Sequence, residues 1–135
     1  MNIKRIATVV VVIAFWAMPA GAQDPGYDTG DELLARCESD PASATRGVCI
    51  GQVVGAMNAI EFTQSIGGPN IICRPPEATN GEGLNVVRAW LRDNSAQRQL
   101  ESTSVIVLAL SEAWPCAGGP VKIDARTGAI LLPRE

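Results

Sequence analysis

The stretch that decides the fold runs from Thr79 to Cys116 and reads TNGEGLNVVRAWLRDNSAQRQLESTSVIVLALSEAWPC. Its first four residues fit a capping box, in which a hydroxyl and a carboxylate accept hydrogen bonds from the free N–H groups of a helix start. We therefore expect a helix to begin at Asn80. Apolar residues recur at helical spacing up to Asn94, and a second apolar run reaches Pro115, which cannot extend a helix. The stretch predicts two antiparallel helices.

In such a helical hairpin the start of the first helix lies beside the end of the second, which brings Cys73 next to Cys116. A turn between two earlier helices would place Cys37 beside Cys49 in the same way. The chain has four cysteines and no histidine. This composition favours disulfides over zinc, whose ligands usually come in closely spaced pairs. Four cysteines allow three pairings; because helix ends should meet, we predict Cys37–Cys49 and Cys73–Cys116, with no metal and no cofactor.

The first 22 residues have the pattern of a cleaved signal peptide. Two basic residues precede an apolar run from Ile6 to Trp16, and Ala20-Gly21-Ala22 gives the small-x-small site that a signal peptidase needs. A membrane anchor is the alternative, but the run falls short of the ~20 residues that span a bilayer. We expect residues 1–22 to be removed, residues 23–28 to form a flexible lead-in, and the mature protein to be periplasmic and free of the membrane.

Two helices are expected before the helical hairpin. A second capping box at Thr29 starts a short helix that ends near Ser39, and a longer helix runs from about Ser43 to Phe62. Each glycine inside a helix costs about 1 kcal/mol relative to alanine, so a close approach of another backbone is expected where glycines recur. We favour the domain's own hairpin as that backbone over a second copy in a homodimer, which the sequence leaves open. The small residues recur at every fourth position, as Gly47, Gly51, Gly55 and Ala59.

A glycine- and proline-rich segment separates the two helical halves, from Thr63 to Ala78. Its composition excludes regular structure, and Cys73 ties it to the core, so we expect an ordered, exposed loop. Loops held on a rigid frame often carry binding residues. The candidate partner-binding residues are Gly67, Gly68, Pro69, Asn70, Arg74 and Pro75 in this loop and Asn94 in the turn between the last two helices.

Beyond Cys116 the pattern changes. Alternating apolar residues around a turn that ends in Gly128 predict a β-hairpin within an extension of residues 117–135. A lone two-stranded hairpin is marginal in water, so we expect it to dock on the helices. The predicted fold class is all-α: a small disulfide-stapled bundle of about four helices in two antiparallel pairs, at residues 29–116, with a short C-terminal β-hairpin.

The composition also limits the function. Without histidine, a Ser-His-Asp or Cys-His catalytic arrangement cannot form, and the acidic residues near helix starts are explained by capping. The net charge is −3 and no run of basic residues is present, which disfavours nucleic acid as a partner. We therefore expect a protein-binding domain and not an enzyme.

Five motifs follow one another in order over residues 29–116, and they are Thr29-Gly30-Asp31-Glu32-Leu33-Leu34, Cys49-Ile50-Gly51, Cys73-Arg74-Pro75-Pro76, Val86-Val87-Arg88-Ala89-Trp90-Leu91 and Ala113-Trp114-Pro115-Cys116. This order resembles the Rap/Tai family of immunity proteins. The resemblance implies a periplasmic, all-helical protein, often a homodimer, that binds a cognate peptidoglycan amidase effector of type VI secretion and blocks its active-site cleft. The alternative is a periplasmic chaperone or structural interaction module without a toxin target, in which the hairpin mediates assembly.

Overall fold

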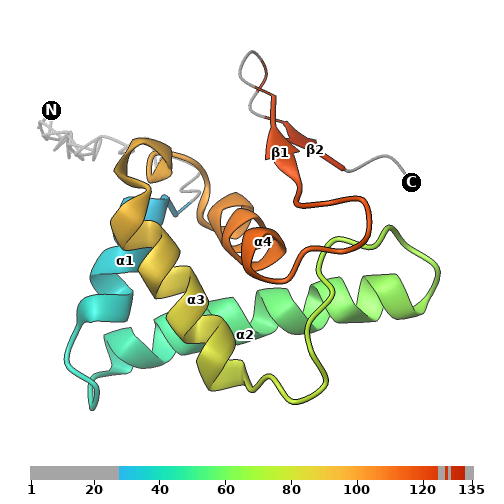
Figure 1. Cartoon of the computed structure of the whole chain (residues 1–135). Coiled ribbons are helices and arrows are strands. Elements are labelled where there is room, and N and C mark those ends of the chain that lie inside the picture. The colour runs from blue at the N-terminus through green and yellow to red at the C-terminus, as the bar shows by residue number, and fades with distance from the viewer. Residues whose placement is uncertain (1–27, 125–126, 128, 133–135) are drawn as a thin grey trace, which may run out of the picture.

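The computed structural model describes residues 28–124, 127 and 129–132, so the expected signal peptide and residues 23–27 of the lead-in lie outside the described residues. In the described part, the chain is all-α apart from one short antiparallel hairpin, as the sequence predicts (Figure 1). The elements are α1 (Gly30–Glu38), α2 (Ala44–Ser65), α3 (Asn80–Asp93), the 3-10 helix η1 (Ser95–Gln97), α4 (Ser102–Ala113), β1 (Lys122–Ile123) and β2 (Ile130–Leu131).

Both predicted capping boxes are formed. At the start of α1, the Thr29 hydroxyl accepts from the backbone N–H of Glu32, whose carboxylate accepts from the N–H of Thr29. The same pair of bonds forms at the start of α3, which begins at Asn80 as expected. α2 continues to Ser65, beyond its predicted end, and stops just before Gly67, whose φ is +91°.

α4 forms the centre of the core. All residues from Val105 to Leu110 are buried, because α1, α2 and α3 pack against α4 and Val121 of the extension joins the same apolar cluster. A helix that is apolar all round is stable only in such a place. α3 packs most extensively on α4, and α1 on α2, so the bundle consists of two helix pairs that share one core.

The start of α1 is attached to the segment before α4. The backbone N–H groups of Gly30 and Asp31 donate to the carbonyls of Leu100 and Arg98, each over 3.0 Å. A Cβ on Gly30 would lie 3.0 Å from the Cα of Arg98. This buried glycine is therefore required by the close approach of two chain segments.

Two disulfides hold the helix pairs. Cys37 is bonded to Cys49 with Cα atoms 5.2 Å apart, and Cys73 is bonded to Cys116 with Cα atoms 5.0 Å apart. These are the same pairs that the meeting of helix ends predicts. Cys73 also donates its backbone N–H to the carbonyl of Trp114 over 2.8 Å. By loop entropy the cross-links contribute about 3 and 4 kcal/mol, a large share of the stability of a small domain.

The β-hairpin docks on the bundle, as predicted. β1 and β2 pair in antiparallel register with Lys122 opposite Leu131. Val121, just before β1, is 3% exposed, and Ile123 and Ile130 pack against the core. Burial of these apolar side chains stabilises a two-stranded sheet that would be marginal alone.

The small-residue stripe of α2 does not pack inside the domain, so the favoured interpretation of the sequence is wrong. Ala59 and the stripe glycines are exposed. Beyond the helix's own backbone, nothing lies within 4 Å of a Cβ built on Gly47, Gly51 or Gly55. Periodicity correctly places these residues on one face of α2, but it does not say which face is buried, because α2 has apolar residues on two sides. The side that packs on the core is the one with Cys49, Val53 and Met57.

The close approach between helices occurs instead at Gly83 of α3. A Cβ at Gly83 would lie 2.5 Å from the Sδ atom of Met57 in α2 and 3.4 Å from the ring of Trp114. Gly83 therefore allows α3 to lie close to the methionine side chain of α2. Gly81 lies two residues earlier, on the exposed side of the same helix. A Cβ built there would have only the Thr79 hydroxyl within 4 Å, at 3.7 Å.

We expect Gly83→Ala to lower the free energy of unfolding by about 1–3 kcal/mol, because an added methyl group overpacks the contact with Met57. The matched control is Gly81→Ala in the same helix, which should be neutral or stabilising by up to about 1 kcal/mol. Urea denaturation followed by circular dichroism measures both. Equal stability of the two variants would contradict the packing described here.

Two carboxylates that precede helices, Asp28 and Glu101, have lowered pKa values. The Arg36 guanidinium donates hydrogen bonds to Asp28 and lowers the pKa of that carboxyl. Burial alone would raise the pKa of Glu101, but hydrogen bonds from Thr103 and Ser104 at the start of α4 outweigh burial and lower it. Both groups are therefore ionised in the folded protein at neutral pH.

We expect the domain to lose stability in acid. A carboxyl with a lowered folded-state pKa stabilises the fold fully above its unfolded pKa of about 4, and this contribution is lost as the pH falls through the folded value. The variants Asp28→Asn and Glu101→Gln should be less stable than the parent at neutral pH and should lose less stability on acidification. Urea midpoints measured from neutral pH down to about pH 2 test this, and parallel curves for parent and variants would refute it.

Candidate protein-binding surface

The loop between α2 and α3 is fixed at its middle by one side chain of α2. The Gln64 side-chain N–H donates to the carbonyl of Ile72 over 2.9 Å, and its oxygen accepts from the N–H groups of Ile71 and Ile72 at 3.2 and 3.1 Å. Ile72 is 2% exposed. The loop is therefore anchored from within, and it leaves Pro69 and Asn70 exposed to solvent.

The two glycines of the loop have conformational roles. Gly67 adopts a φ of +91°, which favours glycine. A Cβ on Gly68 would lie 2.6 Å from the methyl carbon of Thr63, whose carbonyl accepts from the Gly68 N–H over 2.9 Å. Gly67 and Gly68 thus shape the turn after α2 and offer little side-chain surface of their own.

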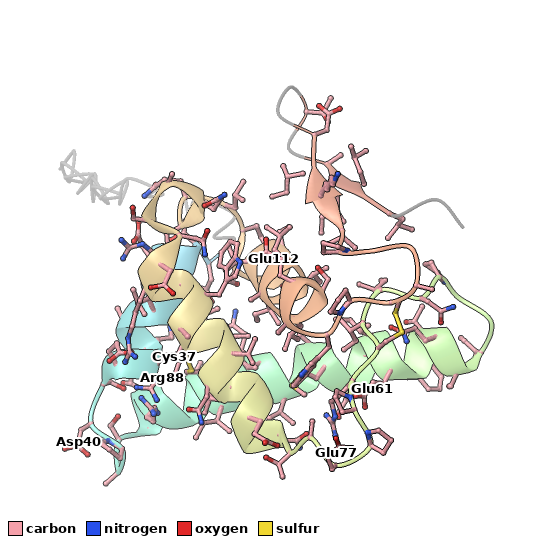
Figure 2. All side chains as sticks on the ribbon, viewed as in Figure 1. Cys37, Asp40, Glu61, Glu77, Arg88 and Glu112 are labelled. Atoms are coloured by element: carbon pink, nitrogen blue, oxygen red, sulfur yellow. A yellow bond between two sulfur atoms is a disulfide. The ribbon has the colours of Figure 1, made fainter. Side chains whose placement is uncertain are left out.

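Arg74 links the loop to two helices. Its guanidinium pairs with Glu61 of α2 at 3.2 Å and donates to the side-chain oxygen of Asn80 over 3.1 Å. Glu61, the ion-pair partner of Arg74, is labelled on α2 in Figure 2, and Glu77 is labelled on the loop. The side chain of Arg74 is only 23% exposed and its charge is already paired. Its main role is therefore to position the loop.

A cavity of about 390 Å³ opens beside the loop. Val86 and Trp114, both partly buried, supply apolar wall, while Glu77 and Glu82 supply carboxylates. Hydrogen bonds from Thr79 lower the pKa of Glu82, which keeps its charge. The cavity can thus accept an apolar side chain with a basic tip. Its full lining is Pro75, Glu77, Ala78, Glu82, Asn85, Val86 and Trp114; we call Pro69, Asn70 and this cavity the loop surface.

Asn94 does not join the loop surface. It is the C-cap of α3 and donates from its side chain to the carbonyl of Trp90 over 2.9 Å. The loop precedes α3 and Asn94 follows it, so the two candidates lie at opposite ends of a helix about 20 Å long. A partner that contacts the loop surface would reach Asn94 only by spanning α3 (Figure 1).

The outward side of α2 is the second exposed surface. Val48, Phe62 and Ile66 are 54%, 64% and 68% exposed, and none of the residues that share their side of the helix is charged. Contiguous apolar surface of this kind commonly marks an interaction site. We define the α2 face as Ala44, Val48, Gly51, Gly55, Ala59, Phe62 and Ile66, with Gly47 at its edge.

Of the residues that line the cavity, only Pro75 is predicted from the sequence. The others could not be predicted, because the walls come from three segments: the loop, α3 and the residue after α4. Trp114 follows α4 and is held beside the loop by the neighbouring Cys73–Cys116 bond and by the hydrogen bond from the Cys73 N–H to the Trp114 carbonyl. The Gln64 anchor was also missed, since a glutamine near a helix end has no distinctive pattern. Its only sequence signal is the pair of adjacent isoleucines, Ile71 and Ile72, in an otherwise polar loop.

Residues 28–124, 127 and 129–132 contain no group of His, Cys, Asp and Glu side chains arranged to hold a metal ion. In the same part of the chain, no helix has both the length and the apolar character needed to cross a membrane.

Comparison with known families gives one match. Residues 29–116, about two thirds of the chain, match the Rap1a immunity proteins. No curated protein and no solved structure matches the chain. The matched segment begins at the cap of α1 and ends at the second disulfide, so it contains α1 to α4, both disulfides and the loop surface. The chain therefore belongs to the Rap1a immunity protein family.

Proposed function

We propose that this protein is a periplasmic immunity protein that binds and sterically blocks a peptidoglycan-targeting amidase effector of type VI secretion. The observation that carries the proposal is the family match over the whole helical domain. The described residues agree with a blocking role, since they offer a disulfide-held surface without a metal cluster. Inhibition then comes from shape and contact and not from chemistry on the effector.

Export to the periplasm is part of this proposal. The N-terminal residues have the pattern of a signal peptide, and the structure uses every cysteine in a disulfide. Disulfides of this kind persist in oxidising compartments such as the bacterial periplasm. An amidase acts on peptidoglycan in that same compartment, so its inhibitor has to be there as well.

The loop surface is the best candidate for the contact with the effector. Its backbone is fixed by Gln64, Arg74 and the Cys73–Cys116 bond, so little conformational entropy is lost when a partner binds. Asn70 presents an exposed amide in the first half of the loop, and the cavity beside the second half offers an apolar wall with two carboxylates. A basic or aromatic side chain at the rim of the effector's active-site cleft would suit this cavity.

We also propose that the α2 face forms a homodimer. If two copies of α2 cross antiparallel about a two-fold axis at Gly55, then Gly51 lies opposite Ala59 and Val48 lies opposite Phe62. Small residues then face each other near the axis, apolar side chains face each other farther out, and the stripe glycines allow close approach of the two backbones. Such a contact would offset the cost of three glycines in an exposed helix, which no contact within the domain does.

We expect the mature protein to protect cells that express the exported amidase encoded beside its gene. Asn70→Trp should reduce protection, because the bulky ring blocks the loop surface. Ser95→Trp, an equally exposed change at the Asn94 end of α3, should leave protection intact. Lysis in the periplasmic co-expression assay gives the readout, with circular dichroism as the folding control. Loss of protection by Ser95→Trp alone would move the binding surface to that end, and lack of protection by the parent would favour a module without a toxin target.

We expect sedimentation analysis to show a dimer that Gly55→Leu converts to a monomer. In the monomer a side chain at Gly55 points into open space, so this variant should unfold at the same or a higher temperature when diluted. Ala35→Leu on the exposed side of α1 is the matched control and should stay dimeric. A monomeric parent at micromolar concentration, or a dimeric Gly55→Leu variant, would rule out this interface.

A further inference from the structure

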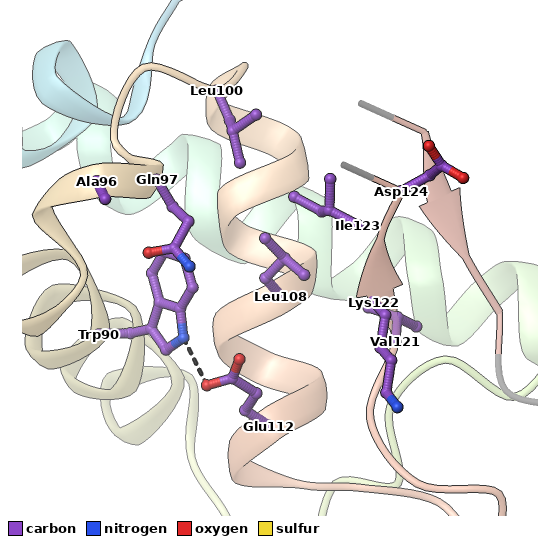
Figure 3. A pocket seen from close by; sticks show the side chains of 10 residues that line it. All are labelled: Trp90, Ala96, Gln97, Leu100, Leu108, Glu112, Val121, Lys122, Ile123 and Asp124. Carbon is purple, nitrogen blue, oxygen red and sulfur yellow. Dashed lines mark hydrogen bonds between the residues drawn. The ribbon is translucent and has the colours of Figure 1, made fainter. Parts of the chain in front are cut away.

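A second cavity lies between the helical domain and the extension. It has a volume of about 480 Å³ and opens between α3, η1, α4 and β1. Figure 3 shows Leu108 of α4 and Ile123 of β1 facing each other across it, with Trp90 on one wall. The Trp90 indole N–H donates to the Glu112 carboxylate over 2.7 Å. We call this cavity the β1 groove; its floor is apolar and its rim is polar.

β1 lines this groove, and one of its edges has backbone groups that no described residue pairs. Asp124 donates its N–H to the carbonyl of Ala129 over 2.9 Å, which makes this position a hydrogen-bonded pair of the antiparallel ladder. Such pairs alternate along a ladder, so Lys122 also faces β2, whereas the N–H and C=O of Ile123 face away from it. Among the described residues, none forms a hydrogen bond with the backbone of Val121, which also lines the groove.

A free strand edge beside an apolar cavity has a specific chemical complement. Unpaired backbone N–H and C=O groups in a partly buried place favour a partner that supplies the matching groups. An extended polypeptide does so by adding as a further strand, and alternate side chains of that strand then enter the pocket. Neither a small anion nor a lipid chain would satisfy both an N–H and a C=O at the same edge.

The side chains of the groove restrict that polypeptide further. Leu100 and Leu108, with Trp90, form a wall suited to a bulky apolar side chain. Glu112 stands beside this wall, because its carboxylate accepts from the Trp90 indole N–H, while the ammonium group of Lys122 belongs to β1. The negative charge of Glu112 beside the apolar wall favours a segment whose apolar residue is accompanied by a basic one.

We propose that the β1 groove binds an extended segment of a partner protein, which adds as a strand to the free edge of β1 and inserts a bulky apolar side chain between Trp90 and Leu108. A basic residue of the segment lies against Glu112. This site is separate from the loop surface and the α2 face. It does not depend on the proposed immunity function, because the groove requires the extension beyond the family-matched residues 29–116.

The first test is selection of a random peptide library displayed on phage against the mature protein. We expect enriched peptides to share an alternating pattern with one bulky apolar residue and a nearby basic residue. The enriched peptide is then synthesised and titrated by calorimetry. Failure to enrich any peptide, or enrichment of helical or acidic sequences, would overturn the proposal.

Two pairs of variants locate the bound peptide. Ala96→Trp fills the groove from the exposed side of η1 and should weaken binding at least about tenfold, whereas Ala89→Trp on the exposed face of α3 lies outside the lining and should bind normally. Ile123→Pro removes an N–H that faces away from β2, a place where an edge strand accepts proline. It should also weaken binding about tenfold, while Ile123→Val should not.

The indole signals of the mature protein give a readout independent of affinity. Trp16 lies in the expected signal peptide, so only Trp90 and Trp114 remain. Peptide binding should shift the Trp90 indole resonance and leave that of Trp114 in place, because Trp114 lines the other cavity. A shift of Trp114 alone, or undiminished binding by Ala96→Trp and Ile123→Pro, would place the peptide elsewhere and refute the proposal.

Discussion

The disulfide between Cys73 and Cys116 is the constraint on which the rest of the structure depends. Together with the hydrogen bond from the Cys73 N–H to the Trp114 carbonyl, it fixes the loop before α3 to the end of α4. Because α4 is apolar on all sides, it must be enclosed. The bond lies within the loop and directly before the extension, so the loop surface and the β1 groove share one anchor.

α2 shows how one helix can serve two environments. Its inner side supplies Cys49, Val53 and Met57 to the core, and its outer side carries bulky apolar residues among glycines. Three exposed glycines weaken a helix by about 3 kcal/mol relative to alanine, and no contact within the domain offsets that cost. The proposed homodimer would cover this uncharged face with a second copy of itself, since the order of its residues about Gly55 suits a two-fold contact.

The sequence specifies the local features of this fold better than the contacts across it. The capping boxes at Thr29 and Thr79 act over three residues, so the helix starts can be predicted, and the helix ends in turn indicate which cysteines meet. The inward side of α2 could not be predicted, because both of its sides are apolar. The contact of Gly83 with Met57 and the Gln64 anchor depend on segments that only the tertiary structure brings together.

The two cavities imply two kinds of selectivity. The loop surface presents side chains on a fixed backbone, so it can discriminate partners by shape and charge at each position. The β1 groove presents backbone groups, which accept any extended sequence, so its selectivity must come from the space beside Trp90 and the carboxylate of Glu112. Because Trp90 and Leu108 belong to the family domain and Ile123 to the extension, the groove exists only where the two are joined. A family member without such an extension could keep the loop surface but not the groove. The proposed partner of the groove is therefore distinct from an effector that the family domain alone would bind.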